Sequence, residues 1–356
     1  MKTPHFKNRK HILLLSAYRS TSHAAWANWL VETFNEFNWH KLELPGRHFR
    51  WRIRGNPLSW INKLPAETPD LILATSMVDL ATLKGLHPQL TKIPCIYYFH
   101  ENQFAYPTSK QQHESVDPQM VQLYGALAAN KICFNSAYNR DSFLNGVDQL
   151  LKRLPDEVPD NINHLLENKS VLLPVPITKV QAADKKISQL ILWNHRWEYD
   201  KAPQVFLNAL LKLNEMNINF KLALLGERSV KKNAALIQIE KAFSEKIIVN
   251  ENLSKQEYQK TLSLSSIVIS TAIHEFQGLA MLEAVSAGAL PIVPDDLCYK
   301  EQYAPEFRYA TGDGDALAKK IFSFLSSPLN DCPLAPDVSF WYGVDLKQKW
   351  RNVLND

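Results

Sequence analysis

The sequence lacks the features typical of disulfide-stapled, zinc-binding or membrane-embedded proteins. It contains only four cysteines in 356 residues, widely spaced and with no CxxC pair. That usage excludes a disulfide framework and gives zinc no support, so we expect buried thiols in a reducing, cytoplasmic compartment. No apolar run approaches the roughly 20 residues of a membrane span, and no small-residue cleavage site follows the basic N-terminus. We therefore expect neither stable membrane association nor a signal peptide.

Acidic residues are scarce in the first sixty positions. Ten Lys and Arg stand there against three Glu, a balance of +7, so the rest of the chain contributes −3 to the formal charge of +4. Basic surface concentrated in one segment predicts a polyanionic partner, with nucleic acid the leading candidate. A solvated basic face without any partner is the alternative.

Short apolar runs alternate with helical patterns along the whole chain, which is 46% apolar and 21% charged. We predict strands at 11–16, 39–44, 70–75, 94–99, 131–135, 171–176, 190–193, 220–225, 246–249, 266–270 and 290–293. We predict helices at 23–37 (capped by Ser22), 78–86, 119–129, from 139 onward, and at 202–215, 230–243, 254–264, 276–287, 314–326 and 340–354, with a mobile loop at 108–118. The alternation of strands and helices occurs in both halves of the chain, and it predicts an α/β protein of two doubly wound Rossmann-like domains facing each other across a cleft.

The predicted domains are 1–177, 178–338 and a terminal helix, 339–356, that packs back on the first domain. Ligands of such sheets bind beyond the carboxyl ends of the strands. That rule brings together the polar segments 16–23, 100–102, 194–196, 226–228 and 274–275.

The segment from Glu275 to Glu283 places one carboxylate on a strand-to-helix turn and a second one further along the helix. Gly278 allows close approach to the helix N-terminus, whose N–H groups suit a phosphate. The two carboxylates could then hold a sugar and a ribose on either side of that phosphate. An ordinary amphipathic helix with a surface Glu is the alternative.

Two cations bracket the loop that follows the first strand of the second half. Arg196 and Lys201 could neutralise a diphosphate, although either could equally belong to an ordinary surface loop.

The run from Arg47 to Arg54 alternates arginine with apolar side chains. Arg47, Arg50, Arg52 and Arg54 could contact phosphates, with Phe49 and Trp51 stacking on an unpaired base. Alternatively, the segment is a strand whose apolar residues face the core while its arginines point outward. Both interpretations stay open, and they are compatible.

These motifs together resemble a known family. Arg196-x4-Lys201 followed by Glu275-x7-Glu283, with Gly278 and Gly288, is similar to retaining glycosyltransferases of family 4, which have the GT-B fold. The segments 44–55, 74–79 and 98–107 more specifically resemble the tRNA-queuosine α-mannosyltransferases, and the likeness covers nearly the whole chain.

The resemblance implies transfer of mannose from GDP-mannose to the cyclopentenediol of queuosine, at the wobble position of tRNA-Asp, with retention of configuration. On the donor side it implies that Glu275 binds sugar hydroxyls, Glu283 the ribose, and Arg196 and Lys201 the diphosphate. The same likeness makes the turn at Phe276, Gly278 and Leu279 part of the donor site, and places His100 close to the transferred sugar. No metal or other cofactor is implied, and Asp295-Asp296 is not a DxD metal motif.

On the acceptor side we expect the anticodon stem-loop of tRNA as partner. The candidate acceptor residues are Ser22, His23, Arg47, Arg50, Trp51, Arg52, Arg54, Glu101, Asn102 and Gln103. For Asn102 and Gln103 a structural hydrogen-bonding role is the alternative. Many relatives carry Gly-Gly after the first strand, where this chain has Arg19-Ser20-Thr21, so the approach of a ligand at that turn is an open point.

Two rival functions remain. The first is a family 4 transferase with another nucleotide-sugar, or with a glycolipid or small-molecule acceptor. Membrane-surface relatives usually have an amphipathic basic–aromatic helix, and we interpret 47–54 as too short and too strand-like for one. The second rival is a non-catalytic RNA-binding protein on the same scaffold, against which the intact donor residues argue. The sequence does not indicate an oligomeric state.

Overall fold

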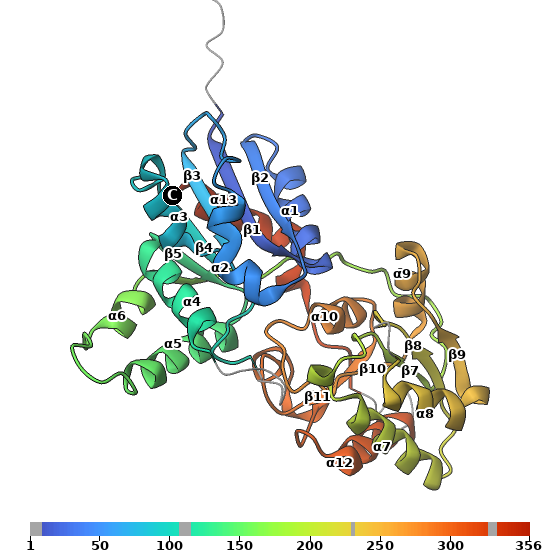
Figure 1. Cartoon of the computed structure of the whole chain (residues 1–356). Helices are drawn as coiled ribbons and strands as arrows, with labels where there is room; N and C mark the ends of the chain where they lie inside the picture. Colours follow the sequence, from blue (N-terminus) through green and yellow to red (C-terminus); the bar gives the residue numbers. More distant parts are fainter. Residues whose placement is uncertain (1–8, 107–114, 229–231, 327–332) are drawn as a thin grey trace, which may run out of the picture. The chain divides into compact units, whose positions relative to one another are not determined.

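The computed structural model describes residues 9–106, 115–228, 232–326 and 333–356. The chain divides into two compact units (Figure 1). Unit 1 comprises Met1–Val175 with Lys347–Asp356, and unit 2 comprises Pro176–Leu346.

Unit 1 is built on a six-stranded sheet of order β2-β1-β3-β4-β5-β6. Its strands are β1 (His11–Arg19), β2 (Asn38–Pro45), β3 (Leu71–Thr75), β4 (Cys95–Phe99), β5 (Lys131–Phe134) and β6 (Ser170–Leu172). All neighbouring pairs are parallel. The central strands are buried on both faces, which is why they consist of continuous apolar runs.

The helices of unit 1 connect these strands and cover the sheet (Figure 1). They are α1 (Thr21–Thr33), α2 (Phe49–Ser59), α3 (Leu80–Leu86), α4 (Asp117–Ala128), α5 (Ala137–Leu151), α6 (Ile162–Glu167) and most of α13 (Gly343–Asn355). Trp350 of α13 is buried against Trp26 and Tyr98, and its indole N–H donates to the Pro174 carbonyl (3.1 Å). The end of the chain therefore completes the core of unit 1.

Unit 2 repeats the plan with the sheet order β12-β11-β10-β7-β8-β9. Its strands are β7 (Leu190–Trp193), β8 (Lys221–Leu224), β9 (Ile247–Asn250), β10 (Ile267–Ile269), β11 (Leu290–Pro294) and β12 (Arg308–Tyr309). The helices are α7 (Pro203–Glu215), α8 (Ala234–Ala242), α9 (Lys255–Leu264), α10 (Leu279–Ser286), α11 (Tyr299–Gln302) and α12 (Gly314–Ser326), with a 3-10 turn, η2, at Tyr199–Lys201. The prediction of two doubly wound parallel sheets is confirmed.

The segment from Arg47 to Arg54 is not a strand, and the strand interpretation of it was wrong. Its residues from Phe49 onward lie in α2, whereas Arg47 precedes the helix and His48, in the left-handed conformation (φ 55°), is its N-cap. The alternation of apolar residues suggested a period of two, but Ile53 and Trp60, seven positions apart, are the ones buried. A helical period explains that spacing. We therefore withdraw the inference that this segment is too strand-like for a membrane-surface helix, and it no longer favours an RNA acceptor over a glycolipid.

Other boundaries shifted for local reasons. The cap of α1 is Ser20, whose hydroxyl accepts from the His23 N–H, and not Ser22. Helix α10 begins at Leu279 and not at Phe276, because Gly278 adopts a left-handed conformation (φ +65°) immediately before it. Most of the predicted loop at 108–118 and the start of the helix predicted at 230–243 lie outside the described residues.

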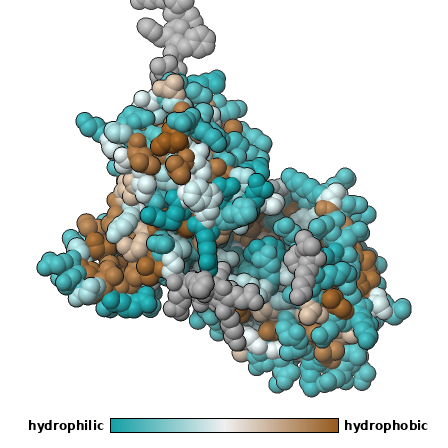
Figure 2. Space-filling view, viewed as in Figure 1, coloured by the Kyte–Doolittle hydropathy of each residue, from teal (hydrophilic) through white to brown (hydrophobic). Residues whose placement is uncertain are grey.

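The exposed apolar and basic side chains of unit 1 lie in different places on its surface. Exposed apolar side chains gather over α4, α5 and α6, toward the lower left of Figure 2. They include Val116, Tyr124, Leu154 and Leu165. Arg50, Arg52 and Arg54 of the basic motif lie instead on α2. Cys95, Cys133 and Cys298 are free and buried, as expected, whereas Cys332 lies outside the described residues.

Candidate active site

The order of the sheet in unit 2 determines where a ligand can bind. Strand β7 lies beside β10, and the chain leaves this central pair toward opposite edges of the sheet. Residues 194–201 follow β7, and residues 270–278 follow β10. Their carboxyl ends meet at a topological switch point, where doubly wound sheets bind their ligands.

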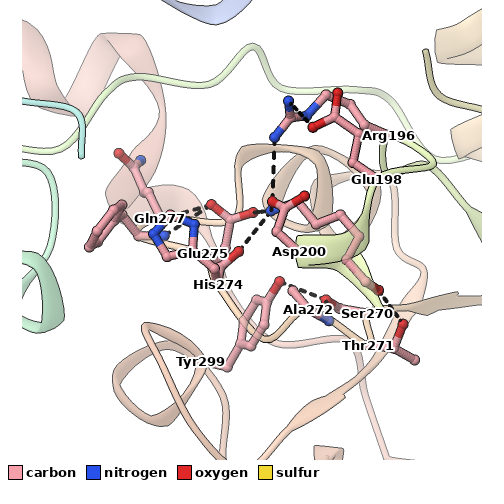
Figure 3. A network of polar contacts seen from close by, with 12 residues as sticks. Arg196, Glu198, Asp200, Ser270, Thr271, Ala272, His274, Glu275, Gln277 and Tyr299 are labelled. Atoms are coloured by element: carbon pink, nitrogen blue, oxygen red, sulfur yellow. Dashed lines mark hydrogen bonds and ion pairs between the residues drawn. The ribbon is translucent and has the colours of Figure 1, made fainter. Parts of the chain in front are cut away.

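Lys201 joins the two loops at this point. Its Nζ lies 3.1 Å from the Glu275 carboxylate and 3.2 Å from that of Asp200, and donates to the His274 carbonyl at 2.8 Å (Figure 3). The Thr271 hydroxyl donates to the Lys201 carbonyl at 2.6 Å. The backbone of each loop is thus fixed by the other.

Both members of the Lys201–Glu275 pair are charged at neutral pH. Burial by itself would raise the pKa of Glu275, but the Lys201 charge, its hydrogen bond and the backbone N–H of Gly278 together outweigh burial and lower that pKa to about 2. For Lys201, burial would lower the pKa, while Glu275 and Asp200 raise it above its ordinary value. The site therefore holds a fixed buried cation beside a carboxylate whose side chain is 21% exposed.

Arg196 is the more accessible cation of the pair that sequence analysis singled out. Its side chain is 45% exposed, with Nη1 2.8 Å from Glu198 and Nη2 3.4 Å from buried Asp200 (Figure 3). Asp200 therefore contacts both Arg196 and Lys201 and fixes the distance between them. Sequence analysis missed Asp200, whose position between two candidate cations was the available signal.

The turn before α10 presents backbone N–H groups. Glu275 Oε1 accepts from the N–H of Phe276 at 3.1 Å, and no side chain caps the helix. A Cβ on Gly278 would come within 3.0 Å of the Tyr299 ring, so glycine is required for space as well as for its positive φ. Phe276 itself is buried edge-on against His274, so its ring shapes the turn.

Glu283 lies further along α10 and has a partner from another helix. The Tyr258 hydroxyl of α9 donates to the Glu283 carboxylate at 2.9 Å, and the Asn194 amide contacts that hydroxyl at 3.4 Å. Burial raises the pKa of Glu283, and the Tyr258 hydrogen bond opposes that shift. Nothing in the sequence linked Tyr258 to Glu283, because they lie on different helices.

Unit 1 places a second group of polar side chains at the carboxyl end of its own sheet. His100 follows β4, and its ring contacts those of His23 (centroids 4.1 Å apart) and Trp26 (4.6 Å). Burial holds the pKa of His100 well below its ordinary value, and that of His23 at about 4. His100 Nε2 is buried and has no hydrogen-bond partner among the described residues. Both imidazoles are neutral at pH 7.

The side chain of Asn102 is committed to the fold. Its Nδ2 donates toward Asn139 Oδ1 (2.9 Å) and Ser142 Oγ (2.9 Å), and its Oδ1 accepts from the backbone of Phe104 (3.0 Å) and Ala105 (2.9 Å). These contacts use both amide protons and both lone pairs, which favours the structural role for this residue.

The residues on either side of Asn102 are less buried than Asn102 itself. Glu101 and Gln103 are partly buried, and Gln103 Nε2 lies 3.5 Å from Glu101 Oε1. Ser22 is exposed, with its hydroxyl 3.2 Å from that of Ser20. All three side chains are at least partly accessible to solvent.

On α2 the arginines differ from one another. Arg54 Nη1 lies 2.7 Å from the buried carboxylate of Asp79, so its charge is already paired. Arg47, Arg50 and Trp51 are exposed. The sequence motifs at 44–55 and 74–79 are thereby in direct contact.

The described part of the chain contains neither a metal-binding cluster nor a membrane-spanning helix. Within it, no group of three or more His, Cys, Asp and Glu side chains could hold a metal ion. Among the same residues, no helix has the length and hydrophobicity needed to cross a membrane.

Comparisons with known proteins address the two halves separately. Residues 11–177 match the family model described as "tRNA-queuosine alpha-mannosyltransferase N-terminal", and residues 177–334 match "Glycosyl transferases group 1". A tRNA-queuosine alpha-mannosyltransferase from Drosophila melanogaster is 33% identical over 335 residues, which cover 90% of this chain and 88% of the relative.

Solved structures with similar folds are more distant in sequence. Sucrose-phosphate synthase from Thermosynechococcus elongatus has a TM-score of 0.73 at 12% identity, with 98% of each chain covered. Anabaena HepE in complex with UDP and glucose has a TM-score of 0.68 at 12% identity, with 98% of this chain and 100% of HepE covered. These similarities show the GT-B fold. The sequence matches show that this hexosyltransferase chain belongs to the tRNA-queuosine alpha-mannosyltransferase family.

Proposed function

We propose that the protein transfers mannose from GDP-mannose to the cyclopentenediol of queuosine, at the wobble position of tRNA-Asp, with retention of configuration. Family membership supports the mannosyl group and the tRNA acceptor. The observation that carries the chemistry is the cluster of Lys201, Glu275 and Arg196 at the switch point of the unit 2 sheet.

The cluster is suited to an anionic leaving group. Lys201 is buried and preorganised, whereas exposed Arg196 could exchange its contact with Glu198 for a phosphate. The free N–H groups at the start of α10 would add their dipole. As the glycosidic bond breaks, negative charge develops on the diphosphate, and these fixed donors would stabilise it. We propose that this electrostatic stabilisation serves in place of a metal ion or other cofactor.

The carboxylates would orient the donor. Glu275, kept ionised by Lys201, would accept hydrogen bonds from mannose hydroxyls, while Glu283, held by Tyr258, would accept from the ribose. On the acceptor side, the unpartnered Nε2 of neutral His100 could exchange a hydrogen bond with a sugar hydroxyl. Retention would follow from departure of GDP and attack of the queuosine hydroxyl on the same face of the sugar.

A second donor has support of its own. The structure of Anabaena HepE is described as a complex with UDP and glucose. The residues proposed above are assigned to the phosphates and the sugars of the donor, and none of them is assigned to its base. A UDP-sugar donor is therefore the alternative. A cytoplasmic location follows from the proposed tRNA acceptor.

The test is a transfer assay with labelled GDP-mannose and, in parallel, labelled UDP-sugars. Each donor is incubated with queuosine-containing tRNA-Asp and with queuosine-free tRNA. Label should pass from GDP-mannose to the first tRNA alone. Transfer from a UDP-sugar would show that the donor is a UDP-sugar and not GDP-mannose. Label in both tRNAs would show that queuosine is not required in the acceptor. No transfer from any donor would favour a non-catalytic RNA-binding protein.

Glu275→Gln tests the assigned site. The amide keeps the shape of the side chain but removes its negative charge and replaces one accepting oxygen with an N–H donor, so kcat should fall by about 100- to 1000-fold. Affinity for tRNA should be unchanged, because the acceptor contacts are assigned to other residues. Glu245→Gln, at an exposed position of the same unit, is the matched control. An equal loss of turnover and tRNA affinity would show that Glu275 is misassigned.

A further inference from the structure

Helix α2 is fixed to unit 1 along one face. Ile53 is buried, and the side chain of buried Asn56 accepts from the Asp79 N–H at 3.1 Å. Arg54 adds an ion pair to the carboxylate of the same Asp79 at 2.7 Å. Two side chains, Arg54 and Asn56, therefore hold α2 to the loop after β3, and the orientation of its exposed face is fixed.

That helix lies at the ligand edge of the sheet. Phe49, in its first turn, packs edge-on against Tyr18 near the carboxyl end of β1, with ring centroids 6.4 Å apart. His23 and His100 lie at the carboxyl ends of β1 and β4. The first turns of α2 thus share an edge of the unit 1 sheet with the candidate acceptor residues.

Trp51 lies flat on α2. A Cβ built on Gly55 would lie 2.6 Å from each of three carbons in the six-membered ring of Trp51. Equal distances to three atoms of one ring place that point over the face of the ring and not at its edge. Gly55 is buried for this reason, while Trp51 remains 49% exposed. One face of the indole rests on the glycine, and the other is open to solvent.

The surroundings of this ring are cationic. No Asp or Glu occurs from Pro45 to Ala66. Arg47 and Arg50 are exposed, and neither forms an ion pair within the part of the chain that the structure describes. The open indole face therefore has positive charge one and four residues away that is available to a phosphate.

We propose that Trp51 is a stacking platform for an unpaired nucleobase of the RNA acceptor, with Gly55 as its seat and with Arg47 and Arg50 contacting the flanking phosphates. Base–aromatic stacking tolerates any base, because every base has a π-face. The identity of the RNA as tRNA rests on the proposed function. A nucleic acid fits this surface because it offers both a planar base and negative charge, and the half of the chain that contains α2 matches the tRNA-specific family.

Four variants separate the parts of the proposal. Trp51→Ala removes the ring, whereas Gly55→Ala keeps the ring but displaces it from its position over residue 55. Alanine favours a helix over glycine by about 1 kcal/mol, so Gly55→Ala should still fold. Arg50→Ala removes only charge. Leu58→Ala is the control, since Leu58 is exposed on the same helix and has no part in the platform.

Binding is measured with the full chain and two RNAs of equal length, a stem-loop with an unpaired loop and a fully paired duplex. Loss of one stacked base corresponds to about 5- to 150-fold in Kd. Trp51→Ala and Gly55→Ala should weaken stem-loop binding within that range and leave duplex binding unchanged. Arg50→Ala should weaken both and reduce the salt dependence. Leu58→Ala should change neither.

An equal loss of affinity for the stem-loop and the duplex would contradict the stacking proposal. Unchanged stem-loop affinity in Trp51→Ala and Gly55→Ala would contradict it as well. Binding to anionic phospholipid vesicles that depends on Trp51, with stem-loop binding unchanged, would overturn it in favour of a lipid surface. The proposed function can fail separately. Trp51-dependent stem-loop binding without mannosyl transfer would remove that function alone, whereas transfer with an unchanged KM for tRNA in both variants would remove the platform alone.

Discussion

At the scale of single residues, the candidate donor site depends on one buried cation. Lys201 has an 8% exposed side chain and contacts two carboxylates, of which Asp200 is almost fully buried. Removal of one partner from such a cluster leaves an uncompensated charge in a poorly solvated place. The same residue is thus needed for folding and, on our proposal, for phosphate binding.

Lys201→Met should therefore lower the free energy of unfolding by about 3–5 kcal/mol at pH 7. Urea denaturation measures this effect. Lys212→Met is the control, because Lys212 pairs with exposed Glu215 at a solvated surface and its loss should leave the midpoint unchanged. Equal midpoints for the two variants would mean that Lys201 is not a structural cation.

At the scale of elements, one lysine fixes two helix ends in unit 2. Lys186 Nζ donates to the carbonyls of Ser263 (3.2 Å) and Ser265 (2.8 Å) at the end of α9, and of Ala287 (2.8 Å) at the end of α10. These carbonyls lack helical partners, and a cation there also complements both helix dipoles. Because α9 contributes Tyr258 and α10 contributes Glu283, Lys186 helps to hold the two residues together.

Lys186→Met should lower the free energy of unfolding by about 2–3 kcal/mol, because it removes the Lys186 hydrogen bonds to the carbonyls of buried Ser265 and Ala287. It should also raise the KM for the donor, since Glu283 would lose its fixed position relative to Tyr258. The adjacent and exposed Lys185, mutated to Met, serves as the control. A loss of stability with an unchanged donor KM would show that the contact does not position Glu283.

At the scale of the whole molecule, both units contain buried neutral histidines. Burial lowers the pKa of His23 in unit 1, and of His195 and His274 in unit 2, to about 4. The unfolded chain binds these protons near pH 6.5 and the folded chain only near pH 4. Stability is therefore complete above pH 6.5 and is lost as the pH falls toward 4, by up to about 3 kcal/mol for each group.

Urea midpoints at pH 7, 6, 5 and 4.5 should fall steadily. Glu275 does not cause this slope, because its pKa of about 2 keeps it charged throughout the window. His23→Asn should make the slope shallower for unit 1, whatever the variant does to stability at pH 7. Midpoints that stay constant from pH 6.5 to 4.5 would contradict burial of neutral imidazoles.

The architecture and the candidate donor residues could be predicted from sequence patterns alone. Parallel strands buried on both faces must be continuous apolar runs, so their positions and their alternation with helices could be predicted. The rule that ligands bind at the carboxyl ends of strands then selected Arg196, Lys201 and Glu275, which the structure brings together.

The partners of these residues, and the helical conformation of α2, depend on contacts between elements that are distant in the sequence. Over a short segment, the spacing of Phe49, Trp51 and Ile53 does not distinguish a period of two from a helical period, and packing against the sheet settles the choice. The contacts of Tyr258 with Glu283 and of Arg54 with Asp79 each join residues 25 positions apart. Such pairs depend on which elements become neighbours in space, and local sequence patterns contain no information about that.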